Sequence, residues 1–390
     1  MPWRETDPMN QKALFIADYL RNSYSITDLC EHYQISRKTG YKWIDRYLIE
    51  GPMGLEDRPR RPKTINRRTP QKIEDAIIKA RHKHPTWGAK KLLKYLSNDY
   101  DLSELPVKST VCDILKRNNL VPKKRRRRPA THPGKPVVDM LAPNQTWCAD
   151  YKGQFKTRDG VYCYPLTITD GYSRYILECK ALLSTELETA KTAFKTVFRQ
   201  YGLPQVILTD NGTPFAANSL ARLTRLSAWW IQLGITPALI EPGNPQQNGR
   251  HERMHKTLKQ ETTLPPAYNL RTQQRKFNAF KDEFNNIRPH EALDMETPND
   301  LYAPSLKPYP EKIEPYVYPD RFETRLVSTN GGIRWRNDRI PVSHVLINQY
   351  IGFEEIDYGL WNVFYCHVKI GILDEKAKLI QDCFGRLERN

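Results

Sequence analysis

Long apolar runs, paired cysteines and glycine-rich nucleotide loops are all missing from this 390-residue sequence. A membrane span needs about 18 consecutive apolar residues, so none is expected. The seven cysteines are scattered and none forms a Cys-x-x-Cys pair, which argues against a disulfide framework or a zinc finger. Neither a P-loop nor a G-x-G-x-x-G motif occurs, so use of ATP or NAD is not expected. The opening residues lack the apolar stretch of a signal peptide, and we expect a cytoplasmic protein.

Basic residues clearly outnumber acidic ones only in the first third of the chain. The formal net charge is +17, from 61 Lys and Arg against 44 Asp and Glu. Residues 1–136 carry +15 of this charge, whereas residues 137–390 carry only +2. A concentrated basic arm is typical of proteins that bind a polyanion. Nucleic acid is the expected partner, and an acidic membrane surface is the weaker alternative.

Composition and periodicity divide the chain into segments of different character. Helical patterns dominate the start, a strand–strand–strand–helix–strand–helix order typical of an α/β domain follows, and short strands between turns end the chain. The regularly spaced short strands are typical of a small β-barrel. We expect a helix-turn-helix domain over 1–56, a second helical module over 70–121, a basic linker over 122–137, a central α/β domain over 138–303 and a β-rich domain over 320–390.

The first helical segment has the layout of a helix-turn-helix. A short turn precedes SRKTGYKWIDRYLIEG, in which Ser36 is the expected N-cap and Gly51 the expected stop. The second helix of this motif enters the major groove of DNA. The residues expected to contact DNA from its first two turns are Arg37, Lys38, Thr39 and Lys42. The alternative is a three-helix core with a solvated basic face.

A second basic feature is the run KKRRRRP, which begins with Lys123, Lys124, Arg125 and Arg126. Such a like-charge run does not fold alone. In a eukaryote it could be a nuclear import signal. Because basic helical modules flank it, we expect it to follow DNA phosphates instead.

Carboxylates at strand ends are the candidates for chemistry. Asp150 ends the strand TWCAD, Asp210 ends VILTD, and Glu252 stands near the start of a helix. Three such oxygen ligands can hold two Mg²⁺ ions about 3.5–4 Å apart. Each residue also has a structural interpretation, as a turn former or as a charge that favours a helix start. Spacing alone does not choose among Glu252, Asp159, Asp170 and Glu241.

The order of four stretches resembles the integrase-like core of bacterial insertion-sequence transposases, in the superfamily of retroviral integrases. Residues 286–302 resemble the segment that closes that core, and the resemblance extends over nearly the whole chain. The four stretches are TWCADYKG around Asp150, LTITDGYSRY (166–175), ILTDNGTPF around Asp210 and PGNPQQNGRHERMHKTLKQE around Glu252.

The resemblance implies a fold and a set of catalytic residues. It implies an RNase H-like integrase core with an Asp-Asp-Glu triad, carried over as Asp150, Asp210 and Glu252. The triad would be both catalytic and metal-binding, with two Mg²⁺ or Mn²⁺ ions per active site. Lys256 and Lys259, on the helix of Glu252, are expected to contact DNA phosphates. One departure is that 41 residues separate Asp210 from Glu252, more than the family usually has.

These observations predict a DNA transposase or integrase of a bacterial cell, associated with the nucleoid. It would bind double-stranded element ends and target DNA, act as a homo-multimer, and cleave and transfer DNA strands. One alternative is a sequence-specific DNA-binding regulator whose catalytic core is vestigial. Another is a simple metal-dependent nuclease of similar fold, which would cleave without joining. No membrane partner is expected.

Overall fold

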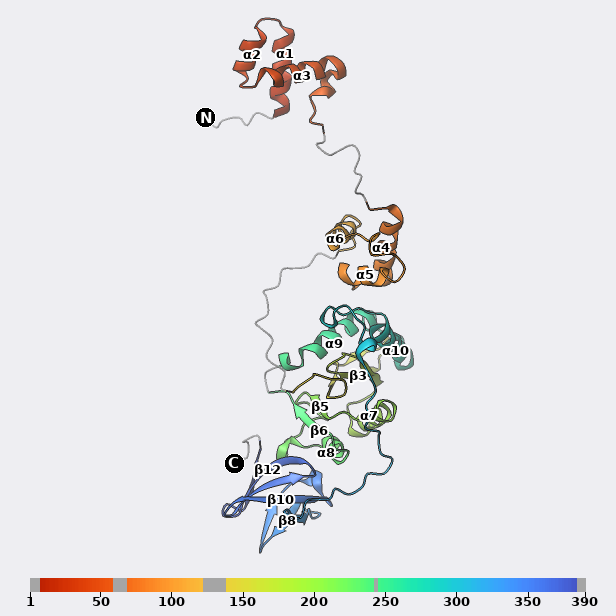
Figure 1. Cartoon of the computed structure of the whole chain (residues 1–390), viewed down its shortest axis with the longest axis vertical. Coiled ribbons are helices and arrows are strands. Elements are labelled where there is room, and N and C mark those ends of the chain that lie inside the picture. The colour runs from red at the N-terminus through yellow and green to blue at the C-terminus, as the bar shows by residue number, and fades with distance from the viewer. Residues whose placement is uncertain (1–7, 59–68, 122–137, 242–244, 384–390) are drawn as a thin grey trace. The chain divides into compact units, whose positions relative to one another are not determined.

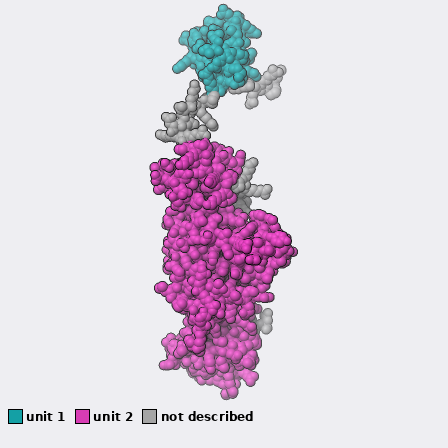
Figure 2. Space-filling model, turned by 90° about the vertical axis from the view of Figure 1, so that its right-hand side faces the viewer, with its two compact units in different colours: residues 1–68 teal, residues 69–390 magenta. Residues whose placement is uncertain are grey.

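The computed structural model describes residues 8–58, 69–121, 138–241 and 245–383. The predicted basic linker, with Lys123, Lys124, Arg125 and Arg126, lies outside these described residues. The chain divides into two compact units, Met1–Arg68 and Thr69–Asn390, which Figure 2 distinguishes by colour. Each unit has its own apolar core.

The first unit is a bundle of three short helices. These are α1 (Pro8–Leu20), α2 (Ile26–His32) and α3 (Arg37–Glu50), followed by the 3-10 helix η1 (Gly51–Leu55). The Ser36 side chain accepts a hydrogen bond from the Thr39 amide, and Gly51 ends α3 with a positive φ of 62°. Phe15, Leu29 and Trp43 are among the buried residues of its core.

Gly40 allows the close crossing of α2 and α3. A Cβ at this position would lie 2.6 Å from the Cys30 Sγ and 3.2 Å from the Phe15 ring. Any larger residue would therefore separate the two helices. The sequence correctly places both the cap and the stop of α3.

The second unit starts with another small helical bundle. Its helices are α4 (Gln71–Lys83), α5 (Ala89–Leu96) and α6 (Lys108–Arg117). Ile77, Trp87, Leu92 and Val111 are completely buried between them. We refer to residues 69–121 as the second helical module.

A mixed sheet forms the centre of the second unit. Its strands are β1 (Thr146–Tyr151), β2 (Phe155–Lys156), β3 (Tyr162–Asp170), β4 (Ile176–Leu182), β5 (Val206–Thr209) and β6 (Thr236–Leu239). The strand order is β4–β3–β1–β5–β6, with the short β2 paired to the start of β3. The first strands form the expected antiparallel meander, while β5 and β6 run parallel to β1.

Helices cover both faces of this sheet. They are α7 (Leu187–Tyr201), α8 (Arg225–Gln232), α9 (Gly249–Thr262), α10 (Leu270–Asn286) and α11 (Pro298–Leu301), with the 3-10 helices η2 (Leu220–Arg222), η3 (Pro245–Asn248) and η4 (Glu291–Leu293). Because side chains alternate along a strand, Trp147 and Ala149 pack toward α7 and α8. Asp150 therefore projects to the opposite face, where α9 and α10 lie.

The longer segment between Asp210 and Glu252 contains α8. The adjacent residues Trp229 and Trp230 lie in this segment, and both belong to the apolar core of the sheet. Trp230 is completely buried and packs edge-on against Phe194 of α7. The pair is therefore structural and is not exposed for stacking on DNA bases.

The C-terminal region is antiparallel β structure. It contains β7 (Glu323–Leu326), β8 (Gly332–Trp335), β9 (Asp338–Pro341), β10 (Tyr350–Asp357), β11 (Leu360–Tyr365), β12 (Val368–Asp374) and β13 (Leu379–Asp382), with the 3-10 helix η5 (His344–Leu346). Five strands form one sheet, and β8 pairs with β9. Its apolar cluster includes Ile231 of α8, and Figure 1 shows α8 beside these strands.

The architecture confirms the expected fold class of helical units, a mixed α/β core and a β-rich end. Within the ranges that the structure describes, no helix combines the length and apolar character that crossing a bilayer requires.

Candidate active site

The first two predicted carboxylates meet at one edge of the sheet. In the parallel pairing of β1 with β5, Ala149 lies opposite Thr209, so the next residues in register are Asp150 and Asp210. Neighbouring strands are about 4.8 Å apart, which keeps these two residues side by side. Burial, followed by the charge of Asp210 and a smaller effect of Glu252, raises the pKa of Asp150 to about 7.

The turn after β5 fixes the Asp210 side chain. Gly212 donates its backbone N–H to the Asp210 Oδ1 at 3.1 Å. A Cβ on Gly212 would lie 3.2 Å from the Asp210 Oδ2, so this close approach favours glycine. The Asn211 side chain donates to the Ile240 carbonyl and ties the turn to the chain after β6. The sequence DNG thus forms a rigid support for one carboxylate.

Glu252 stands in the first turn of α9 and is exposed. Helical geometry gives α9 three distinct faces. His251, His255 and Leu258 pack on the sheet, whereas Glu252 shares the adjoining exposed face with Lys256 and Lys259. Both lysines are thus exposed on the same side of the helix as the third predicted carboxylate.

Two buried histidines connect α9 to the strand beside Asp150. The Nε2 atoms of His251 and His255 lie 2.7 and 2.6 Å from the Thr167 Oγ1, and Thr169 Oγ1 lies 2.9 Å from the other His251 nitrogen. Thr167 is the register partner of Asp150 across β1 and β3. Sequence reasoning missed both threonines, because only strand register brings them under α9.

Asp150, His251 and His255 form a group whose potential ligand atoms lie within 4.8 Å of one another, among the residues that the structure describes. Both nitrogens of His251 already have threonine partners. The remaining His255 Nδ1 lies 3.5 Å from the Asp150 Oδ2. Burial lowers the pKa of His251 to about 3 and also lowers that of His255. Because their nitrogens already face Thr167, Thr169 and Asp150, these imidazoles hold α9 and Asp150 in place.

The carboxylates suit hard divalent cations better. Mg²⁺ and Mn²⁺ prefer carboxylate oxygens, and crowding of negative charge is what such ions relieve. Burial is the largest cause of the raised pKa of Asp150, and the charges of Asp210 and Glu252 add to it. The donor chemistry of the three carboxylates is that of a divalent metal site, but they are not a group whose ligand atoms all lie within 4.8 Å of one another in the described residues.

The other acidic candidates occupy different places. Asp159 accepts a hydrogen bond from Thr157 in the turn before β3. Asp170 ends β3 opposite Trp147, and Asn144 and Ser173 donate three hydrogen bonds to its carboxylate. Glu241 is exposed beyond the end of β6.

The predicted DNA-contacting residues of the first unit lie on α3. Arg37, Lys38 and Lys42 are exposed, and the Lys42 Nζ lies 4.8 Å from the centre of the Trp43 ring. Thr39 is half-buried, and its side chain lies 2.9 Å from that of Ser36 at the helix start. Thr39 therefore contributes to the helix cap, while its three basic neighbours face solvent.

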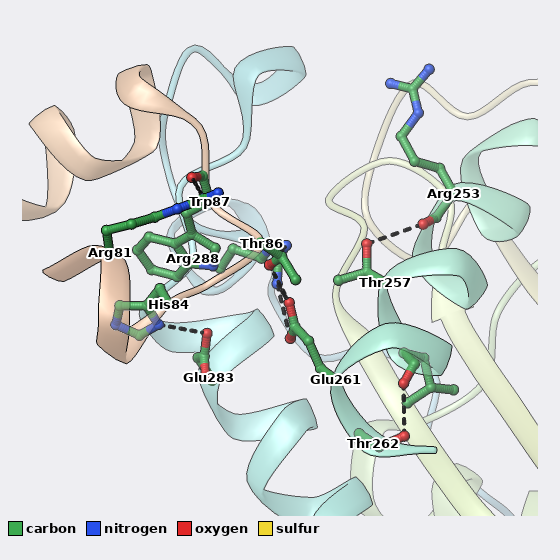
Figure 3. Close-up of polar contacts among 11 residues, drawn as sticks. Arg81, His84, Thr86, Trp87, Arg253, Thr257, Glu261, Thr262, Glu283 and Arg288 are labelled. Atoms are coloured by element: carbon green, nitrogen blue, oxygen red, sulfur yellow. Dashed lines mark hydrogen bonds and ion pairs between the residues drawn. The ribbon is translucent and has the colours of Figure 1, made fainter. Parts of the chain in front are cut away.

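The second helical module is attached to the integrase-like core through polar contacts. His84 Nδ1 lies 3.0 Å from a Glu283 carboxylate oxygen, and Arg288 and Thr86 both donate to Glu261, as Figure 3 shows. Two lysines of α5 also contribute to this attachment. Lys90 pairs with Glu291 and Lys94 with Glu296, so both bind the core.

Family models match most of these regions. Residues 141–245 and 233–298 each match a model of an integrase core domain, residues 11–63 match a helix-turn-helix domain, and residues 39–115 match a homeodomain-like domain. An uncharacterized protein of insertion element IS136 from Agrobacterium tumefaciens is 30% identical over 179 residues, which cover 43% of this chain and 86% of that protein. The chain belongs to the family of insertion-element transposases with an integrase core.

More distant similarities point to viral proteins. The Gag-Pol polyprotein of baboon endogenous virus is 31% identical over 121 residues, 31% of this chain and 7% of the polyprotein. The HTLV-2 integrase catalytic core domain in complex with magnesium aligns with a TM-score of 0.34 and 16% identity, covering 42% of this chain and 100% of that domain. The integrase core places this transposase among polynucleotidyl transferase-type enzymes of DNA integration and implies dependence on a divalent metal. Its helix-turn-helix region indicates DNA binding.

Proposed function

We propose that this transposase binds the ends of its element and catalyses DNA strand cleavage and strand transfer with Asp150, Asp210 and Glu252. The observation that carries the proposal is the pairing of Asp150 with Asp210 in register, joined by the charge of Glu252. The comparisons support the broader class of DNA integration.

Each region of the chain has a part in this reaction. Arg37, Lys38 and Lys42 would contact an element end in the major groove, with Thr39 at the helix start. The basic run from Lys123 to Arg126 would follow phosphates toward the core, where Lys256 and Lys259 hold the reacting strand. Both ends of an element must be joined to one target, so we propose a homo-multimer on the DNA.

The carboxylates act on one phosphodiester at a time. Asp150, Asp210 and Glu252 would hold two divalent cations, which supply a deprotonated attacking oxygen and stabilise the leaving oxygen. A water oxygen, or later a DNA 3′-hydroxyl, forms the new P–O bond as the old one breaks in line. His255 and Thr167 would keep Asp150 in position against the strand.

Strand transfer on DNA that carries both element ends tests this proposal. The full-length protein with Mg²⁺ should cleave and join labelled ends. The joining rates of Asp150→Asn and Glu252→Gln should fall at least a thousandfold. Removal of a metal ligand removes transition-state stabilisation of about 4 kcal/mol or more. A gel-shift assay should show unchanged binding of the ends by both variants.

Glu241→Gln is the matched control, since Glu241 is an exposed carboxylate near the same loop. It should retain the joining rate of the parent protein. Full joining by Asp150→Asn would overturn the assignment of the triad. Binding of ends without any cleavage by the parent protein would instead favour a DNA-binding regulator, and cleavage without joining would favour a nuclease.

A further inference from the structure

A small cavity of about 90 Å³ lies where the second helical module meets the integrase core. Its walls come from α5, the turn between β3 and β4, the start of α9 and the chain after α10. Basic side chains are concentrated in it: Lys91, Arg174, Arg250, Arg253, Arg288 and His290. The cavity lining includes neither the Asp-Asp-Glu triad nor any residue of the helix-turn-helix.

Of the five lysine and arginine side chains of the cavity, only Arg288 forms an ion pair with a carboxylate in the described residues, and Lys91 and Arg174 are the two most relevant of the others. Arg288 pairs with Glu261, and Arg250 donates to the Gly171 carbonyl at 2.7 Å. Lys91 and Arg174, by contrast, form no ion pair with any carboxylate in the described part of the chain. Both are at least partly removed from water, which makes the missing counter-charge costly.

The pKa values of Lys91 and Arg174 are lowered mainly by burial, and neighbouring positive charges add to the effect. Burial, with a further contribution from Arg288, lowers the pKa of Lys91 to about 8, and the charges of Glu291 and Glu261 offset only part of this shift. Burial and the charges of Arg250 and Arg253 lower the pKa of Arg174. The buried Asp170 also lines the cavity, but its carboxylate already accepts three hydrogen bonds from Asn144 and Ser173.

His290 supplies a second and independent indication of a ligand. It is only 7% exposed, and its Nε2 has no hydrogen-bond partner among the described residues. Its ring is also hydrogen-bonded to the backbone of Phe284, so the imidazole orientation is fixed. A buried polar atom without a partner is rare and destabilising. His290 is neutral in the unliganded protein, and an oxyanion in the cavity would favour its protonation, so that Nε2 gains a proton and donates it in a hydrogen bond to the anion.

Helix α9 connects the cavity to the candidate active site. Arg250, Arg253 and Thr257 follow one face of α9 and line the cavity. Glu252, Lys256 and Lys259 occupy the adjoining face. A DNA strand that reaches the carboxylates therefore has further phosphates available to the cavity on the same helix.

We propose that this cavity binds a backbone phosphate of the DNA substrate, with Arg174 and Lys91 as the counter-charges and His290 as a further donor. The proposal rests on DNA being the substrate, as proposed above, but it does not require the Asp-Asp-Glu triad. DNA is favoured over a free phosphate ion because the cavity adjoins the helix that carries Glu252. The second helical module thus completes a site on the core by supplying Lys91.

The salt dependence of DNA binding tests this site. Affinity of the full-length protein for a fluorescein-labelled duplex would be measured in EDTA over a series of chloride concentrations. Each phosphate contact contributes about one unit to the slope of log affinity against log salt. Arg174→Gln and Lys91→Gln should each lower the slope by about one unit and weaken binding several-fold. Arg174→Lys should keep most of the salt slope and most of the affinity.

Arg271→Gln is the matched control, because Arg271 is exposed in the first turn of α10, away from the cavity lining. It should leave the slope unchanged. Parent-like slopes for both Arg174→Gln and Lys91→Gln would overturn the proposal, as would an equal loss in Arg271→Gln. Calorimetric binding of inorganic phosphate, abolished in Arg174→Gln while the duplex slope stays unchanged, would identify a free-phosphate site instead and also overturn it.

Failure of this site and failure of the proposed function are separable. If the parent protein joins no DNA ends but Arg174→Gln still loses its phosphate contact, the cavity assignment stands and the catalytic proposal fails. If the parent protein joins ends and the slopes do not differ, the reverse holds.

Discussion

Buried imidazoles are the most distinctive residues of the integrase core at the scale of single side chains. His251 and His255 are held by Thr167, next to the strand that carries Asp150. His290 lies in the basic cavity with one ring nitrogen unpartnered in the described structure. All three are removed from water, so each resists protonation in the folded state.

The stability of the second unit should therefore depend on pH through His290. Burial, with the charges of Lys91, Arg288 and Arg174, lowers its pKa from an ordinary 6.5 to about 3. Below pH 6.5 the unfolded chain binds a proton that the folded chain does not bind, so stability falls as pH falls. Between about pH 7.5 and about pH 5 the loss should be about 2 kcal/mol for this residue.

Urea unfolding of the parent protein and of His290→Gln in phosphate-free buffer measures this loss. The variant should lose about 2 kcal/mol less than the parent protein between the two pH values. His344→Gln, an exposed histidine of η5, is the control and should behave as the parent protein does. Identical pH dependence in parent protein and His290→Gln would contradict the buried, neutral state of His290.

Residue types alone were enough to nominate Asp150, Asp210 and Glu252, because strand ends and helix starts can be recognised in sequence. The choice of Glu252 over Glu241 still needed the family resemblance. Thr167 and Arg174 could not be nominated in this way. Each matters through residues that are distant in sequence, and only register and packing bring those residues together.

Helix α9 carries residues of both the candidate active site and the basic cavity. Its sheet-facing side holds the two histidines, its exposed side carries Glu252 with Lys256 and Lys259, and its remaining side faces the second helical module. The module and the core thus meet on the helix that carries a candidate metal ligand. The contact between Glu261, Arg288 and Thr86 joins α9 to the module directly.

Removal of the Glu261 charge should loosen the second helical module. The Arg288 side chain is 7% exposed and would be left as an unpaired buried charge in Glu261→Gln. Loss of one partner of such a pair costs about 3 kcal/mol or more. Amide hydrogens of α5 should then exchange about a hundredfold faster.

Glu291→Gln is the matched control for this experiment. Glu291 pairs with Lys90 at the same interface, but both side chains are well exposed and screened by water. Exchange in α5 should stay at the parent rate in this variant. A parent-like rate in Glu261→Gln would show that its ion pair does not hold the module.

At the scale of the whole molecule, the net charge and the apolar cores both separate the N-terminal part of the chain from the rest. Of the net +17, +15 lies in residues 1–136, which contain the matches to the helix-turn-helix and homeodomain-like models. The near-neutral remainder contains the integrase core and the β-rich end. The first unit has a separate apolar core, whereas the β-rich end shares a cluster with α8 of the integrase core.

Separate cores predict separate unfolding transitions. Phe15 is 2% exposed in the first unit, and Phe15→Ala should cost about 3–5 kcal/mol there, enough to unfold most of a small bundle. Scanning calorimetry should show the loss of one transition with the other unchanged. Leu14→Ala changes a neighbouring side chain that is 55% exposed, and it should leave both transitions in place. A parallel shift of both transitions in Phe15→Ala would contradict independent cores.

The sequence by itself determined the class of this protein. Charge asymmetry, helix caps and strand-end carboxylates follow from local patterns, and the motif order indicated the integrase-like core before any contact was known. Tertiary structure alone decided how these parts meet. It turned Lys90 and Lys94 toward glutamates of the core, placed Thr167 beside Asp150, and gathered Lys91, Arg174 and His290 into one cavity. The physical reason is that local pattern records which face of an element is buried, whereas register and packing choose what that face is buried against.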